Sequence, residues 1–274
     1  MKLTYTVAYD FNGNIKEFCQ KQGFSTTQIK RFKYNGSICV NGRPCTVRKG
    51  LCAGDLVELC CNEELDPVLP GKDAATILFC DDYLFVADKP FGIPVHPDRK
   101  YKDGTFGNML AAAFGKDFRL RIITRLDKTT SGLVLGARNE ICASALNDLQ
   151  LRHEIHKTYY AKVQGELVGA GNVNLPLGRL DEQNKTVVDA KGKEALTSYQ
   201  ALSFDGTSTI VMLRPHTGRT HQLRAHMAAI GHPICGDELY GGSAADRIYL
   251  HCAKLEFVHP FSRENICVES PCPF

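Results

Sequence analysis

The order of the apolar runs along the chain constrains its fold more than any other feature. From residue 74 onward, many apolar runs are short enough for strands, and those at 77–80 and 84–87 follow one another with only a turn between them. Because strands and helices do not alternate strictly, the sequence predicts an α+β fold, with a mainly antiparallel mixed sheet flanked by helices. The predicted strands span 77–80, 84–87, 133–137, 159–163 and 209–213, and the predicted helices span 106–114, 140–152 and 221–230.

A break in this periodicity lies between residues 62 and 73. The segment holds two prolines, one glycine and four acidic residues, a composition typical of a linker. With 274 residues, the chain has room for one large domain and one small module. We therefore predict a small module at 1–61, a linker at 62–73 and a large domain at 74–274.

The composition indicates an ordinary globular protein. Hydrophobic residues make up 43% and charged residues 23%, which excludes a disordered or fibrous chain. The twelve cysteines include no CxxC pair, and the N-terminus has no apolar stretch long enough for a signal peptide or a membrane span. We expect reduced thiols in a cytoplasmic monomer that has no membrane partner.

The small module carries the pattern of a helix pair followed by a hairpin. The helices are predicted at 15–22 and from residue 26 or 27 to 34, and the strands at 37–43, ending in an Asn-Gly turn, and at 54–59. The motifs G-x-I-x-V-N-G at 36–42 and G-D-x-V at 54–57 resemble the RNA-binding domain named after ribosomal protein S-four. An unrelated α+β module with an Asn-Gly hairpin is the alternative.

The net charge of +3 is too weak by itself to indicate a nucleic-acid partner. A local cluster is more informative, because three cations lie on the predicted second helix of the module. They are Lys30, Arg31 and Lys33. We predict that they contact RNA phosphates.

Two blocks of the large domain concentrate the polar groups that chemistry would need. In the first, Arg125 and Asp127 stand between two apolar runs, where they are either functional or a structural pair that caps a turn. In the second, three arginines and three histidines fall within 213–226. Thr220 could cap a helix from His221, leaving Arg219 free to reach a carboxylate or a phosphate.

The histidines of the second block, His216, His221 and His226, recur every five residues. This spacing does not place them on one face of a helix as metal ligands. A metal-dependent hydrolase is therefore the weakest of the functions considered.

Six motifs in order make the chain similar to the RluA family of pseudouridine synthases over about residues 77–260. The four stronger ones are R-L-D-x-x-T-S-G at 125–132, K-x-Y-x-A-x-V-x-G at 157–165, G-R-T-H-Q-L-R-x-H at 218–226 and G-H-P-I-x-G-D-x-x-Y-G at 231–241. Weaker signatures lie at 88–97 and 250–257. One departure is Thr124, which stands where many relatives have histidine before the Arg-Leu-Asp.

The resemblance implies a catalytic site of three residues. Asp127 is the catalytic carboxylate, acting on the ribose either as a nucleophile at the anomeric carbon or as a base at the adjacent position. Arg219 is the guanidinium that favours its ionised form. Tyr159 stacks against the target base, near the proton that leaves carbon five. Neither a redox cofactor nor a metal is required.

The resemblance also implies an RNA-binding surface. Arg125 is expected to occupy the position that the target uridine vacates when it leaves the stack, with a phosphate contact as the alternative. The other predicted phosphate contacts are Lys89, His96, Lys128, Arg214 and Arg224. The expected substrate is large-subunit ribosomal RNA rather than transfer RNA. A non-catalytic RNA-binding or ribosome-assembly protein is the competing interpretation.

Overall fold

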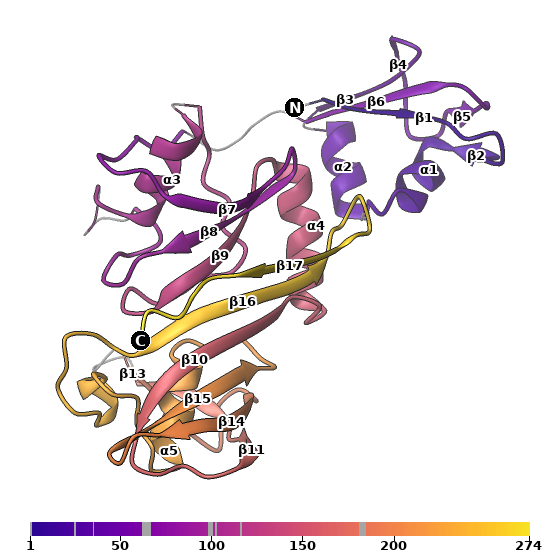
Figure 1. Ribbon diagram of the computed structural model, residues 1–274. Helices are drawn as coiled ribbons and strands as arrows, with labels where there is room; N and C mark the ends of the chain where they lie inside the picture. Colours follow the sequence, from indigo (N-terminus) through magenta and orange to yellow (C-terminus); the bar gives the residue numbers. More distant parts are fainter. Residues whose placement is uncertain are drawn as a thin grey trace.

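The computed structural model describes residues 2–24, 26–34, 36–61, 67–97, 101, 103–115, 117–180 and 185–274. Figure 1 shows a small N-terminal unit beside a larger one that is built on a long twisted sheet. Each unit has its own hydrophobic core. Within the described residues, no helix is both long enough and apolar enough to span a membrane.

A nine-stranded sheet organises the larger unit. Its strands follow the order β11-β14-β15-β10-β16-β9-β8-β7, and β17 pairs with β16. Every pairing is antiparallel except that of β16 with β9. The predicted α+β class with a mainly antiparallel mixed sheet is therefore confirmed. The strands are β7 (Thr76–Cys80), β8 (Leu84–Lys89), β9 (Ser131–Ala137), β10 (His156–Gln164), β11 (Ala170–Asn174), β14 (Leu196–Phe204), β15 (Ser208–Pro215), β16 (Leu250–Val258) and β17 (Asn265–Glu269).

Three helices flank this sheet, α3 (Phe106–Phe114), α4 (Glu140–Leu151) and α5 (Gln222–Ala229). The first two begin where a polar side chain caps them: Thr105 and Asn108 form a reciprocal capping box before α3, and Asn139 accepts from the backbone N–H of Cys142 at α4. Their apolar faces pack into the core of the sheet. A short hairpin of β12 (Leu177–Leu180) and β13 (Lys185–Val188) and a 3-10 turn, η2 (Glu238–Tyr240), complete the unit.

The N-terminal unit is a four-stranded sheet with two helices. The strand order is β1-β6-β3-β4, and a two-residue pair, β2 with β5, lies beside it. The helices bury Ile15, Phe18 and Phe32 against Val57 and Leu59 of β6. The elements are β1 (Lys2–Thr6), β2 (Gly13–Asn14), α1 (Ile15–Lys21), α2 (Thr26–Tyr34), β3 (Gly36–Val40), β4 (Arg43–Pro44), β5 (Gly50–Leu51) and β6 (Leu56–Cys61).

The chain between the units packs against α3. Residues 62–66 of the predicted linker lie outside the described residues. From Val68 onward the backbone is already bound to the larger unit, because the N–H groups of Val68 and Gly71 donate to the carbonyls of Phe118 and Asn108. The second half of the predicted linker is thus an extended segment of the larger unit.

The N-terminal unit is docked on the larger one through α2. The Gln28 amide donates to the Ile141 carbonyl at 2.9 Å, and the Arg31 guanidinium lies 2.8 Å from the Glu140 carboxylate at the start of α4. The ring of Phe24 contacts Phe261, in the turn between β16 and β17. The Arg31 guanidinium thus takes part in the contact between the units, and with its side chain 41% exposed its phosphate contact stays a prediction.

Gly132 marks the closest approach of two strands beneath the loop of Asp127. Its φ is +110°, and a Cβ there would lie 2.6 Å from the backbone nitrogen of Cys252 and closer still to that residue's carbonyl oxygen. Only a residue without a side chain allows β9 to pair with β16 at this point.

We expect Gly132→Ala to lower the free energy of unfolding by about 2 kcal/mol or more, because it combines a strained backbone with a clash against β16. Denaturant unfolding measures the change. Gly206→Ala is the matched control, since Gly206 also has a positive φ, +96°, but has open space around it. Equal losses in the two variants would contradict the role given to the close approach of the strands.

Candidate active site

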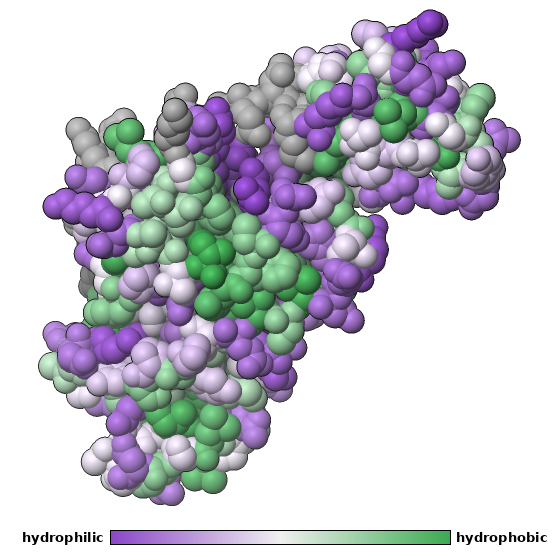
Figure 2. Space-filling model, turned by 45° about the horizontal axis from the view of Figure 1, so that its top comes forward, coloured by the Kyte–Doolittle hydropathy of each residue, from purple (hydrophilic) through white to green (hydrophobic). Residues whose placement is uncertain are grey.

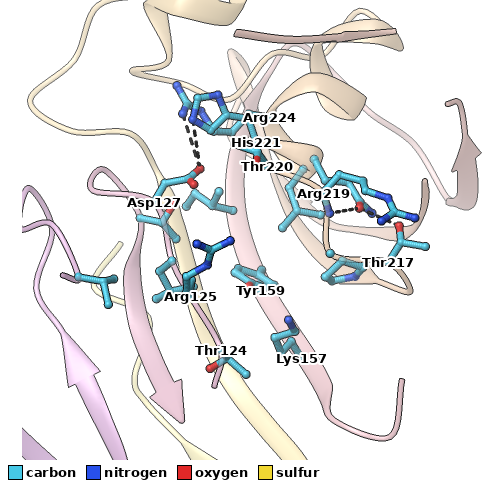
Figure 3. A pocket seen from close by; sticks show the side chains of 18 of the residues that line it. Thr124, Arg125, Asp127, Lys157, Tyr159, Thr217, Arg219, Thr220, His221 and Arg224 are labelled. Carbon is cyan, nitrogen blue, oxygen red and sulfur yellow. Dashed lines mark hydrogen bonds and ion pairs between the residues drawn. The ribbon is translucent and has the colours of Figure 1, made fainter. Parts of the chain in front are cut away.

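A cleft of about 650 Å³ crosses the larger unit over β10 (Figure 3). The loop between α3 and β9 forms one wall, and the loop between β15 and α5 forms the other. The lining of the cleft includes polar and charged side chains from several elements: Asp127, Arg125, His96, Lys157, Tyr159, Gln150, Arg219, His221 and Arg224.

Asp127 is the carboxylate at the centre of this cleft. Its side chain is 29% exposed, and Oδ2 lies 3.6 Å from Nη1 of Arg224 and 3.8 Å from Nε2 of His221. The backbone around it forms a turn in which Thr130 N–H donates to the Asp127 carbonyl. The carboxylate therefore faces a guanidinium and an imidazole while remaining open to a ligand.

Arg224 is held by a second carboxylate. Its Nε and Nη2 atoms donate to the two oxygens of the fully buried Asp237, at 2.7 and 2.8 Å, and its guanidinium lies over the ring of Tyr240. A bidentate pair of this kind fixes the plane of the guanidinium. The remaining nitrogen, Nη1, is thereby directed toward Asp127.

The expected pairing of Asp127 with Arg219 is wrong. The Arg219 side chain turns away from Asp127, and its Nε donates to the Glu194 carbonyl at 2.9 Å, although the residue lines the same cleft (Figure 3). Arg224, predicted as a phosphate contact, is buried and occupies the place beside Asp127 instead.

The start of α5 explains this exchange. Thr220 does not cap the helix, which begins at Gln222 after His221, whose φ is +51°. The Gln222 side chain folds back and accepts from Thr217 Oγ1 and from the Arg219 N–H. These bonds fix the loop so that the Arg219 side chain turns away from Asp127. Arg224 belongs to α5, and its side chain is buried. In the sequence, Arg224 stands between the apolar residues Leu223 and Ala225. This pattern is the signal that could have indicated a buried arginine with a carboxylate partner.

Tyr159 lines the cleft next to Asp127. It is 6% exposed and pairs across the sheet with Leu213 and Cys252. Burial raises the pKa of its phenol, and the neighbouring Cys252 thiol and Asp127 carboxylate add to the shift. The phenol is therefore neutral at physiological pH and can act as a stacking surface with a polar tip.

Lys89 does not belong to a phosphate-binding surface. It is fully buried, and its Nζ donates to the carbonyls of Pro90, Ile93 and Lys128 at 2.8, 2.9 and 3.2 Å. Burial lowers its pKa to about 7, and the charge of Asp127 opposes this shift. Because Lys128 directly follows Asp127, the lysine anchors the loop that carries the carboxylate.

The other predicted RNA contacts are exposed. Arg125 and His96 line the cleft, where partial desolvation of the imidazole, together with the charge of Arg125, lowers the pKa of His96. Lys128 donates to the Tyr101 hydroxyl at the rim, and Arg214 lies on β15 outside the lining of the cleft. These four positions remain predictions for RNA binding.

The three histidines of the second block have separate surroundings. His216 contacts Ser198, His226 is buried between Thr197 Oγ1 and the Leu175 carbonyl, and His221 faces Asp127 and Tyr240. In the part of the chain that the structure describes, no three His, Cys, Asp or Glu side chains converge as they would around a metal ion. His221 is a site residue that the sequence analysis did not assign, and its left-handed backbone fits a residue held for function.

Thr124 is a structural residue in this chain. It is buried, and its Oγ1 accepts from the Leu135 N–H at 2.9 Å. The contact ties the loop of Asp127 to β9, so that the hydroxyl supports the loop from below.

Several known proteins are similar to this chain. The fold is shared with the structure of human RNA pseudouridylate synthase domain containing 1, with a TM-score of 0.62 and 27% identity, over 75% of this chain and 86% of that one. The chain is 32% identical to ribosomal large subunit pseudouridine synthase D of Xylella fastidiosa, over 91% of this chain and 82% of the relative. It is 37% identical to the dual-specificity RNA pseudouridine synthase RluA of Vibrio cholerae, over 75% and 86% of the two chains.

The family model for RNA pseudouridylate synthase matches residues 83–229, a range that includes Asp127, Tyr159 and Arg224. The chain therefore belongs to the RNA pseudouridylate synthase family. It is an RNA isomerase of that family.

Replacing Arg224 by lysine tests the pairing with Asp127. We expect Arg224→Lys to lower kcat by about a hundredfold, since a lysine cannot bind Asp237 bidentately and still face Asp127. Arg219→Ala is the matched control and should change kcat by only about a few-fold, because Arg219 contacts the Glu194 carbonyl. The measurement is single-turnover pseudouridine formation. A larger loss in Arg219→Ala than in Arg224→Lys would contradict the assignment.

Lys89 should make stability depend on pH. Its pKa is about 7 in the folded protein, against an ordinary value of 10.5, so the unfolded chain binds more protons between these values. The free energy of unfolding should therefore gain a contribution that rises with pH from about 7 to 10.5, and Lys89→Met should remove this slope. Urea unfolding across this range measures it. Lys128→Met, which removes an exposed lysine, should keep the slope of the wild type.

Proposed function

We propose that this isomerase converts specific uridines to pseudouridine in large-subunit ribosomal RNA, with Asp127 as its catalytic carboxylate. The observation that supports this most directly is the position of Asp127, in the cleft beside Tyr159 and against the guanidinium of Arg224. Binding an anionic polymer would not require a carboxylate there, which argues against a non-catalytic RNA-binding protein.

The reaction breaks the N1–C1′ bond of uridine, turns the base and joins C5 to C1′. The base loses the proton of C5 and gains one at N1. Asp127 acts on the ribose, either as a nucleophile at C1′ or as a base at the adjacent carbon, and the guanidinium of Arg224 faces it at 3.6 Å. Tyr159 stacks against the base and lies near the proton that leaves C5.

RNA must release the uridine from its stack before Asp127 can reach the sugar, at a cost of roughly a few kcal/mol. Arg125, exposed at the cleft, can take the vacated position with its planar guanidinium. Lys30 and Lys33 are exposed on α2, and we propose that the N-terminal unit, an S-four-type RNA-binding domain, holds phosphates through them.

The choice of ribosomal RNA follows the Xylella fastidiosa relative, whose name assigns it to the large ribosomal subunit. Transfer RNA is the alternative substrate expected from the motifs, and the name of the Vibrio cholerae relative assigns a dual specificity to that enzyme. We propose that the enzyme acts in the cytoplasm, because both RNAs are found there. We also propose that it is a monomer.

Mapping pseudouridine in total RNA from cells that lack the gene tests both the chemistry and the substrate. We expect sites in large-subunit ribosomal RNA to disappear, the wild-type gene to restore them and Asp127→Asn to restore none, because an amide cannot act as nucleophile or base on the ribose. Asp117→Asn, at an exposed position outside the cleft lining, is the control and should restore every site. Restoration by Asp127→Asn would refute the catalytic assignment, and loss confined to transfer RNA would refute the substrate.

A further inference from the structure

Lys157 lines the cleft on the side of Tyr159 that is away from Asp127 (Figure 3). Lys157 and Tyr159 both come from β10 and both line the cleft, whereas Thr158 between them is buried. Positions two apart on a strand are separated by about 6.6 Å. This step is comparable to the length of a pyrimidine ring, from its glycosidic bond to the opposite edge.

Lys157 has no anionic partner among the described residues. Its ammonium group makes no hydrogen bond and no ion pair with any residue that the structure describes. Burial lowers its pKa, as expected for a lysine held among apolar walls. A partly buried donor of this kind gains from a ligand that brings an acceptor.

Gln150, near the end of α4, supplies the complementary group. Its Oε1 atom is buried and has no hydrogen-bond partner among the described residues, although the residue lines the same cleft. An orphaned buried acceptor is costly, and its cost is removed when a ligand donates to it. The lining of the cleft therefore holds one donor and one acceptor that have no hydrogen-bond partner among the described residues.

We infer that Lys157 and Gln150 read the outer edge of the target base and select uracil over cytosine. With the ribose at Asp127 and the ring against Tyr159, Lys157 donates to O4 of uracil and Gln150 accepts from N3–H. Cytosine presents an amino group and an unprotonated nitrogen at the same places, so both contacts become donor against donor and acceptor against acceptor.

This inference rests on the proposed action at uridine, and substrate analogues separate the two. The probes are short synthetic RNAs with the uridine mapped above in its natural surroundings. At that position they carry uridine, cytidine or 4-thiouridine, which keeps N3–H but has a weakly accepting sulfur in place of O4. Affinities are measured in an Asp127→Asn background, so that no turnover occurs. Replacing O4 by sulfur should weaken binding about ten-fold when Lys157 is present and leave it unchanged in Lys157→Met, because N3–H and its contact with Gln150 are kept.

Two further variants complete the design. Gln150→Leu should reduce the preference for uridine over cytidine about ten-fold, since it removes the acceptor for N3–H. Lys162→Met is the matched control, because Lys162 lies on the same strand but pairs with Asp205 outside the cleft lining, and it should keep both preferences. Thermal unfolding verifies that each variant is folded.

The outcomes separate the hypotheses. If Lys157→Met retains the full ten-fold dependence on O4, the inference is overturned, even when the variant also reduces the rate, because Lys157 then only positions Tyr159. If the wild type forms no pseudouridine in any RNA, the proposed function itself is wrong, whatever the binding measurements show. Loss of the O4 dependence in Lys157→Met, with the control unchanged, supports the inference.

Discussion

The shared guanidinium of Arg224 is the interaction on which the rest of the site depends. Asp237 is fully buried, so its charge is tolerable only while Arg224 binds it with two hydrogen bonds. Removing one member of such a pair costs about 3–5 kcal/mol, which locks α5 to the loop that carries Asp237. With its plane fixed in this way, Arg224 meets Asp127 from a single direction. The structural pair thus also sets the charge that the Asp127 carboxylate faces.

Asp127 itself sits on a loop that is supported from below. Lys89 bridges the carbonyl of Lys128 to two carbonyls of its own segment, Thr124 holds the loop to β9, and Gly132 lets β9 approach β16 closely. A loop that is open to RNA keeps its side chains in place when its backbone is bound to rigid strands. The cleft combines these fixed walls with two unpaired polar groups, Lys157 and Gln150, which leaves a ligand to complete its hydrogen bonding.

Hydrophobic periodicity predicted much of the fold. The three helices of the larger unit and its strands β7, β8, β9, β10 and β15 carry strong apolar patterns and were predicted within a few residues. Strand β14 was missed because it is mostly exposed beyond Thr197, and β1 because a single short strand at the N-terminus has little pattern of its own. Their place in a sheet comes from pairing partners far away in the sequence, which local propensity does not record.

By itself, the sequence determined the class of fold, the family and the identity of the groups at the site, since motifs and periodicity are local properties of the chain. Only the tertiary structure decided which groups meet. Whether Arg219 or Arg224 faces Asp127 depends on the residue at which α5 begins, and the hydrogen bonds of the Gln222 side chain set that residue. Tertiary structure also decides the partners of Lys89 and Arg31, which look alike in the sequence as cations. Lys89 donates to three backbone carbonyls, whereas Arg31 pairs with the Glu140 carboxylate. Burial and partners from distant segments determine what a charged side chain does, and both arise only on folding.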